Sequence, residues 1–556
     1  MTRYSALIAL AALAAAHAAG VPPARPAPPA MPAEGTAGMV STAHPLATDA
    51  GVGILRAGGN AFDAAVAIAA ALNVVEPENS GLGGYGTIVV YDARRRESRF
   101  LNPSGRIPAA VDSDAFRPPT TDYLANRRGA KAVSTPGNLH AWEALSKTYG
   151  SLPWARVLQP ATALAERGFE LDAAGAAAIA SAYASFPPSA QRFYGRDGRP
   201  LQPGERLVQA DLAGTLRAVA SGGPDVFYRG PVGRAIDAAM RGSGGFLALA
   251  DLEADRAEWY PTIGITYRGR QIVTAPPPAN TFDYLVRLGL MSRFDCRALG
   301  HNSAGYLHRF AEATKFGFWV RLKYAGDPDV APPPLGLLLS EAYWRDEAAK
   351  IDLERASRFE PPSRAPEPGQ HTTHFVVADR WGNVVSATQT LGNTFGSRIM
   401  PEGTGVWLNN SLAYCTFEPK GNPMDAHAGR RKLSGDCPTI VMQDGRPWVA
   451  IGTPGGHTIG QTVPQMVMNL IDFEMDIAAA IAAPRISFVE PDGLAVEQGV
   501  PVEVRNALAA KGHRVQTARA LGNAHGLTIE YRDGRPVRFT GAADPRGRGT
   551  AAGVTK

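Results

Sequence analysis

The residues with the clearest chemical potential are two threonines in the segment His-Thr-Thr-His at 371–374. They follow the proline-rich stretch 361–370 and precede an apolar run, which indicates a position between an exposed loop and a strand. A threonine hydroxyl is a weak nucleophile without a base beside it, and one solution is to free its own α-amino group by cutting the preceding peptide bond. Cleavage between His371 and Thr372 would put that nucleophile at the start of a rigid strand. The local pattern alone favours two ordinary β-branched strand residues, so the nucleophile interpretation depends on the wider pattern of the sequence.

Strand-like runs surround this segment in the last third of the chain. Residues 373–379 and 383–390 flank a short turn, and residues 439–443 and 447–453 repeat the pattern around an Asp-Gly turn. These spacings predict antiparallel hairpins.

The part before the proline-rich stretch is predicted to be largely helical. In residues 47–75, apolar positions recur every three or four residues on both sides of Gly58-Gly59, which predicts two helices joined by a glycine turn. Residues 152–171 and 303–325 have the same period, whereas 86–93 has strand character. Helices and strands in this order indicate stacked layers without fixing their sequence in space.

The N-terminus has the features of a signal peptide over residues 1–18. Arg3 precedes an apolar stretch, and Ala16 and Ala18 form an A-x-A arrangement. An uncleaved N-terminal anchor is the alternative, but the apolar stretch is short for a membrane span.

Residues 19–38 are rich in Pro and Ala and lack periodicity, which predicts an extended linker, with the folded part beginning near Met39. We therefore expect an exported protein, periplasmic or secreted, without a membrane span in its mature form.

Composition excludes several classes of function. The 556 residues carry 56 basic and 51 acidic side chains without a long basic run, so nucleic acid is not an expected partner. Three cysteines allow at most one disulfide. No C-x-x-C or H-E-x-x-H spacing indicates zinc, and no G-x-S-x-G elbow indicates a serine hydrolase.

Five ordered segments resemble the gamma-glutamyltransferase family, whose members are also called gamma-glutamyltranspeptidases or glutathione hydrolases. The segments span essentially the whole mature chain, and such ordered agreement is far more specific than one motif. They are residues 44–86, 134–169, 372–397, 403–410 and 438–456.

The resemblance implies an α+β fold, the four-layer αββα sandwich of N-terminal-nucleophile hydrolases. It also implies an inactive precursor that cuts itself between His371 and Thr372. The products would be a large subunit, residues 39–371, mostly helical with sheet strands, and a small subunit, residues 372–556, that stay together. The implied enzyme needs no metal or organic cofactor.

The resemblance also assigns roles in catalysis. Thr372 matches the nucleophile, and Thr390 matches a threonine that orients it by a hydrogen bond. Gly455 and Gly456 match the pair whose amides stabilise the charge of the tetrahedral transition state. The implied reaction transfers the acyl group of a small γ-glutamyl amide such as glutathione to the enzyme and then to water or an acceptor amine.

The substrate-binding positions depart from the family pattern. Ser104 stands where an arginine would hold the glutamyl carboxylate, and Arg106 follows as a candidate substitute. Ala413 and Tyr414 stand where two aspartates would meet the α-ammonium group.

Two further positions differ. A serine pair reads Ser434-Gly435, and Gly392 takes the place of an asparagine, so that Asn393 follows one residue late. The candidate substrate-binding residues are therefore Arg106, Ser434, Asn393 and Tyr414.

We expect an autoprocessing threonine-nucleophile amidohydrolase and acyltransferase that cleaves γ-glutamyl amides, with hydrolysis favoured over transfer. The altered pocket leaves open an acylase, similar to cephalosporin acylases, that acts on a non-glutamyl acyl amide. An exported binding protein that has kept the fold and lost activity is the alternative from another class.

Four polar residues lie near these motifs, and for three of them we expect a structural role rather than a catalytic one. We expect His371 to be an exposed linker residue and His374 a strand residue. His457 is left open as a substrate contact. Cys415 is expected to be a buried thiol or to form a disulfide with Cys437 rather than to be a second nucleophile.

Overall fold

A computed structural model of the chain describes residues 32–279, 281–362, 371–431 and 434–555. The predicted signal peptide 1–18, most of the linker 19–38 and most of the proline-rich stretch 361–370 lie outside the described residues. Within the described ranges, no helix combines the length and the apolar character that a membrane crossing requires.

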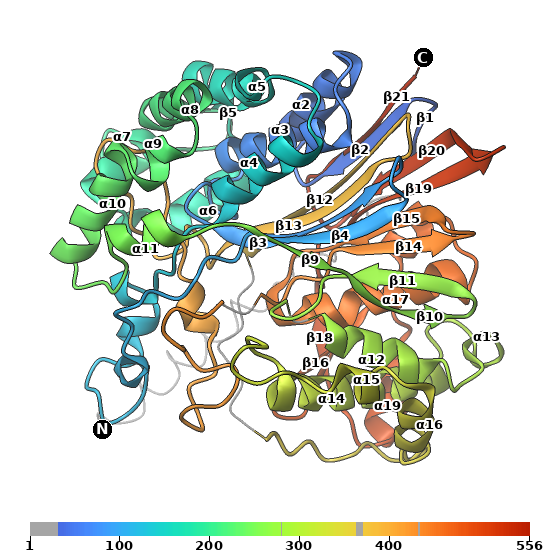
Figure 1. The fold of residues 1–556 in the computed structure, drawn as a ribbon. Helices are drawn as coiled ribbons and strands as arrows, with labels where there is room; N and C mark the ends of the chain where they lie inside the picture. Colours follow the sequence, from blue (N-terminus) through green and yellow to red (C-terminus); the bar gives the residue numbers. More distant parts are fainter. Residues whose placement is uncertain (1–31, 280, 363–370, 432–433, 556) are drawn as a thin grey trace, which may run out of the picture.

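Two seven-stranded antiparallel sheets lie face to face at the centre of the molecule (Figure 1). The first sheet has the order β21 (Thr550–Val554), β2 (Gly38–Thr42), β12 (His371–Asp379), β13 (Val384–Gly392), β3 (Tyr85–Asp92), β4 (Glu97–Asn102) and β9 (Glu258–Pro261). The second sheet has the order β1 (Ala33–Gly35), β20 (Arg535–Ala543), β19 (His525–Arg532), β15 (Arg446–Gly452), β14 (Thr439–Gln443), β11 (Arg270–Thr274) and β10 (Ile263–Tyr267).

Helices cover the outer face of each sheet. Those associated with the first sheet include α2 (Pro45–Arg56), α3 (Ala61–Val75), α4 (Asn138–Tyr149), α5 (Trp154–Arg167), α6 (Ala173–Ala182), α7 (Pro188–Tyr194), α8 (Ala210–Gly222), α9 (Asp225–Tyr228), α10 (Pro231–Gly242) and α11 (Leu249–Ala254). Those on the side of the second sheet include α12 (Phe282–Met291), α13 (Cys296–Leu299), α14 (Ala304–Tyr324), α15 (Leu335–Leu338), α16 (Glu341–Ala348), α17 (Ile459–Ile471), α18 (Ile477–Ala482) and α19 (Val502–Ala510).

Smaller sheets complete the fold. They join β16 (Ile486–Val489), β17 (Gly493–Glu497) and β18 (Arg514–Ala518), then β5 (Phe169–Glu170) with β8 (Arg206–Leu207), and β6 (Gly195–Arg196) with β7 (Arg199–Pro200).

Three hydrophobic clusters separate the four layers. The cluster between the sheets contains Met39, Val376 and Val384 from the first sheet and Ile440 and Phe539 from the second. A second cluster joins the first sheet to α2 and α3, and a third joins the second sheet to α12, α14 and α17. Each sheet is apolar on both faces, so its inner face packs against the other sheet and its outer face packs against helices. This order of layers confirms the predicted αββα sandwich.

The predicted elements are present near their expected boundaries. The glycine turn between α2 and α3 has Gly58 at φ +90°, and Asn60 then caps α3 by accepting hydrogen bonds from the amides of Phe62 and Asp63. The predicted hairpins are confirmed as β12 with β13 and β14 with β15, and the helices at 152–171 and 303–325 as α5 and α14.

The expected linker boundary is wrong at its C-terminal end. Ala33–Gly35 forms strand β1, which pairs with β20 through Ala33 opposite Gly541, so the ordered fold begins before Met39. Backbone pairing needs no apolar periodicity, which is why the Pro- and Ala-rich composition hid this strand.

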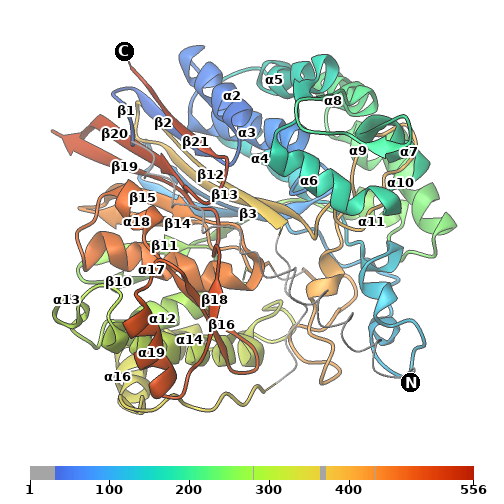
Figure 2. The ribbon, with the colours of Figure 1, turned by 180° about the vertical axis from the view of Figure 1, so that it is seen from behind.

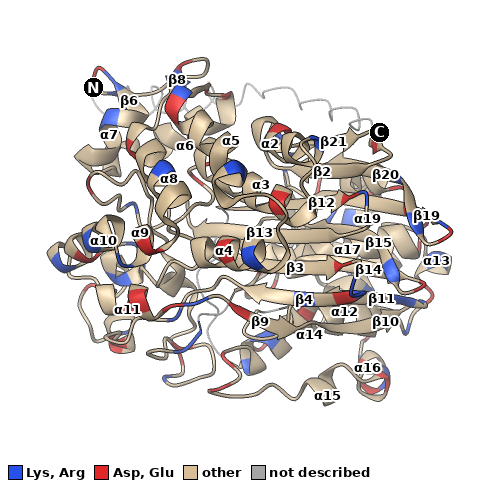
Figure 3. Cartoon of the chain, turned by 45° about the horizontal axis from the view of Figure 1, so that its top comes forward, with Lys and Arg blue, Asp and Glu red and all other residues tan. Residues whose placement is uncertain are grey.

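Both sheets mix strands from before and after Thr372. In the first sheet, β2 lies between β21 and β12, and in the second, β1 lies beside β20. The two residues that follow β1 also contact β21, because the amides of Thr36 and Ala37 donate to the carbonyl of Val554 at 3.0 and 2.7 Å. Figure 2 shows these strands together from behind. Acidic and basic residues alternate along the helices and loops of the ribbon in Figure 3.

Candidate active site

Thr372 and Thr390 lie opposite each other on the two central strands of the first sheet. The register pairs them directly between β12 and β13. On β12, Thr373 and Phe375 face α3, so the alternation of side chains directs Thr372 and Val376 toward the second sheet. Both threonines are buried, and the Thr372 hydroxyl donates to the Thr390 hydroxyl at 3.1 Å.

The peptide bond between His371 and Thr372 lies at a break in the strand register. His371 pairs with Gly392 and Thr372 with Thr390, so a bulge occurs between His371 and Thr372. The Thr390 hydroxyl donates to the carbonyl of His371 at 2.7 Å and accepts from the amide of Gly392 at 2.8 Å. One hydroxyl therefore contacts both the candidate nucleophile and the carbonyl next to it.

Within the described residues, β12 is paired along this segment at one edge, by β13. Strand β2 pairs with β12 from Phe375 to Asp379, so the residues around Thr372 lie beyond the end of β2. The neighbouring Thr373 hydroxyl donates to Glu76 at 2.8 Å, and Arg548 bridges Glu76 and Glu78 at 3.2 and 2.7 Å. Burial raises the pKa of Glu78 to about 7, against the lowering effect of Arg548.

The glycine pair follows a strand that crosses close to β12. A Cβ atom on Gly452 of β15 would lie 2.3 Å from the ring of His374, so only glycine permits this approach. Gly455 and Gly456, three and four positions later, have φ of +140° and +58° and start the turn η6 (Gly456–Thr458) that leads into α17. Among the described residues, neither amide donates a hydrogen bond to a partner. Free amides at a helix N-terminus are suited to stabilise an oxyanion.

Gly392 and Tyr414, two positions where the sequence departs from the expected pattern, lie against each other. Gly392 has φ of +100°, and a Cβ atom there would lie 2.3 Å from Asn410 Oδ1 and 2.9 Å from Tyr414 Cε2. The Tyr414 hydroxyl donates to Asn393 Oδ1 at 2.7 Å, and Asn410 Oδ1 accepts from the Asn393 amide at 2.9 Å. The tyrosine ring thus uses space that a side chain at 392 would need, so the two changes belong to one rebuilt unit.

Arg106 is held by an ion pair. Its side chain, 38% exposed, donates to Glu258 at 2.8 Å and to the carbonyl of Gly429 at 3.1 Å. The buried Arg431 also binds Glu258, and it donates to the carbonyl of Ser104 at 2.7 Å. The arginine that lies against Ser104 is therefore Arg431, from a distant loop that the linear pattern did not indicate.

Ser434 contacts an acidic residue that sequence reasoning missed. Its hydroxyl donates to Asp436 Oδ2 at 2.7 Å, and both residues are buried. Burial raises the pKa of Tyr85 well above its ordinary value, and the nearby Tyr414 and Asp436 add to that effect. Tyr85 pairs with Thr390, so Asp436 acts on a residue of the strand that lies beside Thr390. No spacing motif marks it, since the contact forms only through folding.

The expectations for the two other histidines and for the cysteines are confirmed in part. His374 is a buried strand residue as predicted, bonded to Thr388 at 2.8 Å, and burial holds its pKa well below the usual range. His371 is not in an exposed linker, because it is the first residue of β12 and partly buried. The cysteines form no disulfide, so the alternative of a bond between Cys415 and Cys437 is wrong and the buried-thiol alternative holds.

His457 is partly exposed, but its ring nitrogen Nε2 is turned inward. The ring packs near Phe318 with 6.1 Å between ring centroids, and Nε2 is buried without a hydrogen-bond partner among the described residues. A contact between His457 and substrate stays a prediction.

Among the described residues, the group able to hold a metal ion is outside this site. It consists of His308 and Glu312 on α14 with His513 before β18.

Comparison with known proteins places this chain in a family. The family model described as Gamma-glutamyltranspeptidase matches residues 47–554. A glutathione hydrolase proenzyme from Escherichia coli strain K12 is 35% identical over 533 residues, with coverage of 92% of this chain and 90% of the relative. An acylase ACY 1 proenzyme from Pseudomonas sp. strain V22 is 37% identical over 538 residues, with coverage of 94% of both. The crystal structure of cephalosporin acylase from Bacillus halodurans aligns with a TM-score of 0.87 at 30% identity and covers 96% of this chain and 98% of that chain.

Proposed function

Because this chain belongs to the gamma-glutamyltranspeptidase family of enzymes, we propose that it is a self-processing amidohydrolase and acyltransferase with Thr372 as its nucleophile. The hydrogen-bond chain from the Thr372 hydroxyl through Thr390 to the carbonyl of His371 is the observation that carries this proposal. We also propose that residues 1–18 act as a signal peptide and direct export of the protein.

Cleavage of the precursor starts at the bulge between His371 and Thr372. The hydroxyl oxygen of Thr372 attacks the His371 carbonyl carbon, and Thr390 polarises that carbonyl by donating to its oxygen. The C–N bond breaks, its nitrogen takes up the proton that the Thr372 hydroxyl gives up and becomes the α-amino group, and an ester remains. Water hydrolyses the ester and leaves the carboxylate of His371 on the large subunit, 39–371, and a free Thr372 on the small subunit, 372–556.

The new amino group then serves as the base for turnover. It accepts the hydroxyl proton while the Thr372 oxygen attacks the carbonyl of an amide substrate. The amides of Gly455 and Gly456 donate to the developing oxyanion, and the leaving amine takes the proton. Water completes hydrolysis of the acyl-enzyme more often than an amine acceptor does.

For the substrate we propose a γ-glutamyl amide such as glutathione, with Arg106, Ser434, Asn393 and Tyr414 facing its head group. A second candidate is an acyl amide without the α-amino group. The Gly392–Tyr414 unit favours this second candidate, because Tyr414 supplies a neutral hydroxyl bonded to Asn393 where an ammonium ion would need a carboxylate.

The test of self-processing is a denaturing gel of purified wild type, Thr372→Ser and Thr372→Ala. We expect two bands that sum to the precursor for the wild type, slower formation of the same bands for the serine variant and one band for the alanine variant. A wild type that stays whole, or an alanine variant that is cut at the same bond, would overturn the proposal.

The test of substrate class compares γ-glutamyl and glutaryl p-nitroanilides, which differ only in the α-amino group. A higher kcat/KM for the γ-glutamyl compound supports the first candidate, and a higher value for the glutaryl compound supports the second. Processed protein without activity on either compound would contradict both.

A further inference from the structure

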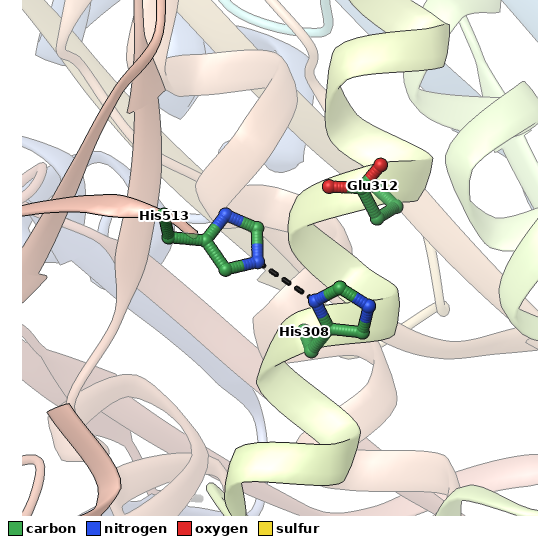
Figure 4. A group of neighbouring side chains, drawn as sticks. All are labelled: His308, Glu312 and His513. Carbon is green, nitrogen blue, oxygen red and sulfur yellow. Dashed lines mark hydrogen bonds between the residues drawn. The ribbon is translucent and has the colours of Figure 1, made fainter. Parts of the chain in front are cut away.

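Two histidines and a glutamate meet on the far side of the second sheet from Thr372. His308 and Glu312 lie one helical turn apart on α14, and His513 lies between α19 and β18 (Figure 4). All three are buried, at 0%, 5% and 5% exposure, and their candidate ligand atoms lie within 4.8 Å of one another. Two imidazoles and a carboxylate are a common ligand set for zinc.

Hydrogen bonds fix the orientation of the His308 ring. Its Nε2 lies 2.8 Å from the carbonyl oxygen of Asp352, which only accepts, so this nitrogen carries the proton. The lone pair of His308 Nδ1 therefore points toward His513 Nε2, 2.8 Å away. A metal-bound histidine usually donates its other N–H to a carbonyl or carboxylate in this manner.

The geometry needs only a small adjustment for a metal ion. Two nitrogens on one tetrahedral zinc lie about 3.3 Å apart, so the rings would separate by about half an ångström. His513 would carry its proton on Nδ1 instead of Nε2. The ion would then lie between the two nitrogens and a Glu312 oxygen.

The Glu312 carboxylate has protein donors on both oxygens. Lys315 Nζ donates to Oε1 at 2.8 Å, and the amide of Ser357 donates to Oε2 at 3.1 Å. Each carboxylate oxygen has two lone pairs, so one remains on each for a metal ion. The Lys315 ammonium group opposes a cation, which makes the affinity of the site dependent on this lysine.

We propose that His308, Glu312 and His513 bind one zinc-class divalent ion, which clamps α14 to the segment before β18. His308 and Glu312 precede residue 372 and His513 follows it, so the ion joins the two subunits. This clamping role rests on the proposed cleavage, whereas the binding site exists equally in the uncut precursor.

The first experiment measures zinc binding in the mature protein and in Thr372→Ala after chelation and dialysis against zinc chloride. We expect one zinc per chain in both proteins. We expect loss of that zinc in His513→Gln and retention in the control His301→Gln, which changes a histidine just before α14 outside the cluster. Absence of stoichiometric zinc in wild type, or equal retention in His513→Gln, would overturn the site in favour of a plain His–His hydrogen bond.

A second variant keeps the test valid if His513→Gln does not fold. Lys315→Met removes the opposing ammonium group, and we expect half-saturation at a zinc concentration about tenfold lower than in wild type. Unchanged or weaker binding would contradict the site.

The clamp itself is tested by subunit dissociation. In the mature protein, chelation should lower the temperature at which the subunits separate, and zinc should restore it. If zinc binds but leaves this temperature unchanged, the clamping role is wrong. Failure of the proposed cleavage would appear separately, as a single band in the wild type.

Discussion

Two regions of the proposed site are positioned by different kinds of contact. We call Thr372 and Thr390 the nucleophile region, and the loops around the candidate substrate-binding residues the head-group region. Thr372 and Thr390 are fixed by the register of two central strands, with helices on one side and a second sheet on the other. The head-group region is assembled from separate loops, through contacts such as Tyr414 with Asn393 and Arg431 with Ser104. Changes in loop contacts leave the strand register intact. The reaction type can therefore persist while the substrate changes.

The largest expected effect comes from removing the Thr390 hydroxyl. It contacts both the Thr372 hydroxyl and the His371 carbonyl, so Thr390→Val should slow precursor cleavage by about 100-fold or more. The measurement is the rate at which the two subunit bands appear from freshly purified precursor.

Thr388→Val is the matched control, since Thr388 is on the same face of β13 but bonds His374. It should lower the unfolding temperature and leave the cleavage rate within a few-fold of wild type. Equal slowing by both variants would show that the strand as a whole, rather than the Thr390 hydroxyl, governs cleavage.

A smaller effect is expected in the head-group region from Gly392→Asn. The new side chain would collide with Tyr414 and Asn410 and strain a backbone with φ of +100°, so kcat/KM for acyl anilides should fall about tenfold or more while precursor cleavage continues. Adding Tyr414→Ala opens the space and should recover part of the loss.

The double-mutant cycle measures this coupling directly. An interaction free energy of about 1–2 kcal/mol in the transition state for turnover would agree with one rebuilt unit. Additive effects of Gly392→Asn and Tyr414→Ala would show that the two departures are independent. Loss of cleavage in either single variant would show that the two regions are not separable.

The last expected difference between the two regions is in acid sensitivity. Burial lowers the pKa of His525 on β19 from 6.5 to about 4, so the unfolded chain binds a proton that the fold excludes. The contribution of His525 to the free energy of unfolding is therefore constant above pH 6.5. As the pH drops toward 4, this residue lowers the free energy of unfolding by about 3 kcal/mol. His374, whose pKa burial also lowers, acts in the same direction.

The head-group region should respond only at lower pH. Burial alone would raise the pKa of Glu258, but hydrogen bonds from Arg431 and Tyr260 outweigh it and hold the pKa at about 2. Its contribution is present above pH 4.5 and is lost between 4.5 and 2. Between pH 7.5 and 4.5 the unfolding temperature should therefore fall more in wild type than in His525→Asn, because only wild type loses this contribution, whereas the raised pKa of Glu78 acts in the opposite direction in both proteins. Parallel profiles of the two proteins would contradict the role of His525.

The strands around Thr372 were predictable because their signals are local. The apolar runs on both sides of residues 380–382 and the glycines between α2 and α3 determine their own structure over a few residues. The roles of Thr390, Gly455 and Gly456 came from the resemblance and stay predictions, although Thr390 does lie against Thr372.

The features that could not be predicted depend on residues far apart in the chain. Strand β1 is defined by its partner β20, and Arg431 reaches Ser104 from a loop more than 300 positions away. The meeting of His513 with α14 is of the same kind. No single-sequence pattern records such contacts, because they arise from the packing of layers.

The contact between the segment after β1 and β21 bears on what the proposed cleavage supplies. Since Thr36 and Ala37 bond the carbonyl of Val554, a short linker between Ala33 and the residues after Val554 would permit a circularly permuted gene whose translation begins at Thr372. Removal of the initiator methionine would then supply the amino terminus. In that permutant, ribosomal synthesis would replace backbone scission as the source of the base. Under the proposed mechanism, turnover would then require only that the chain begin at Thr372.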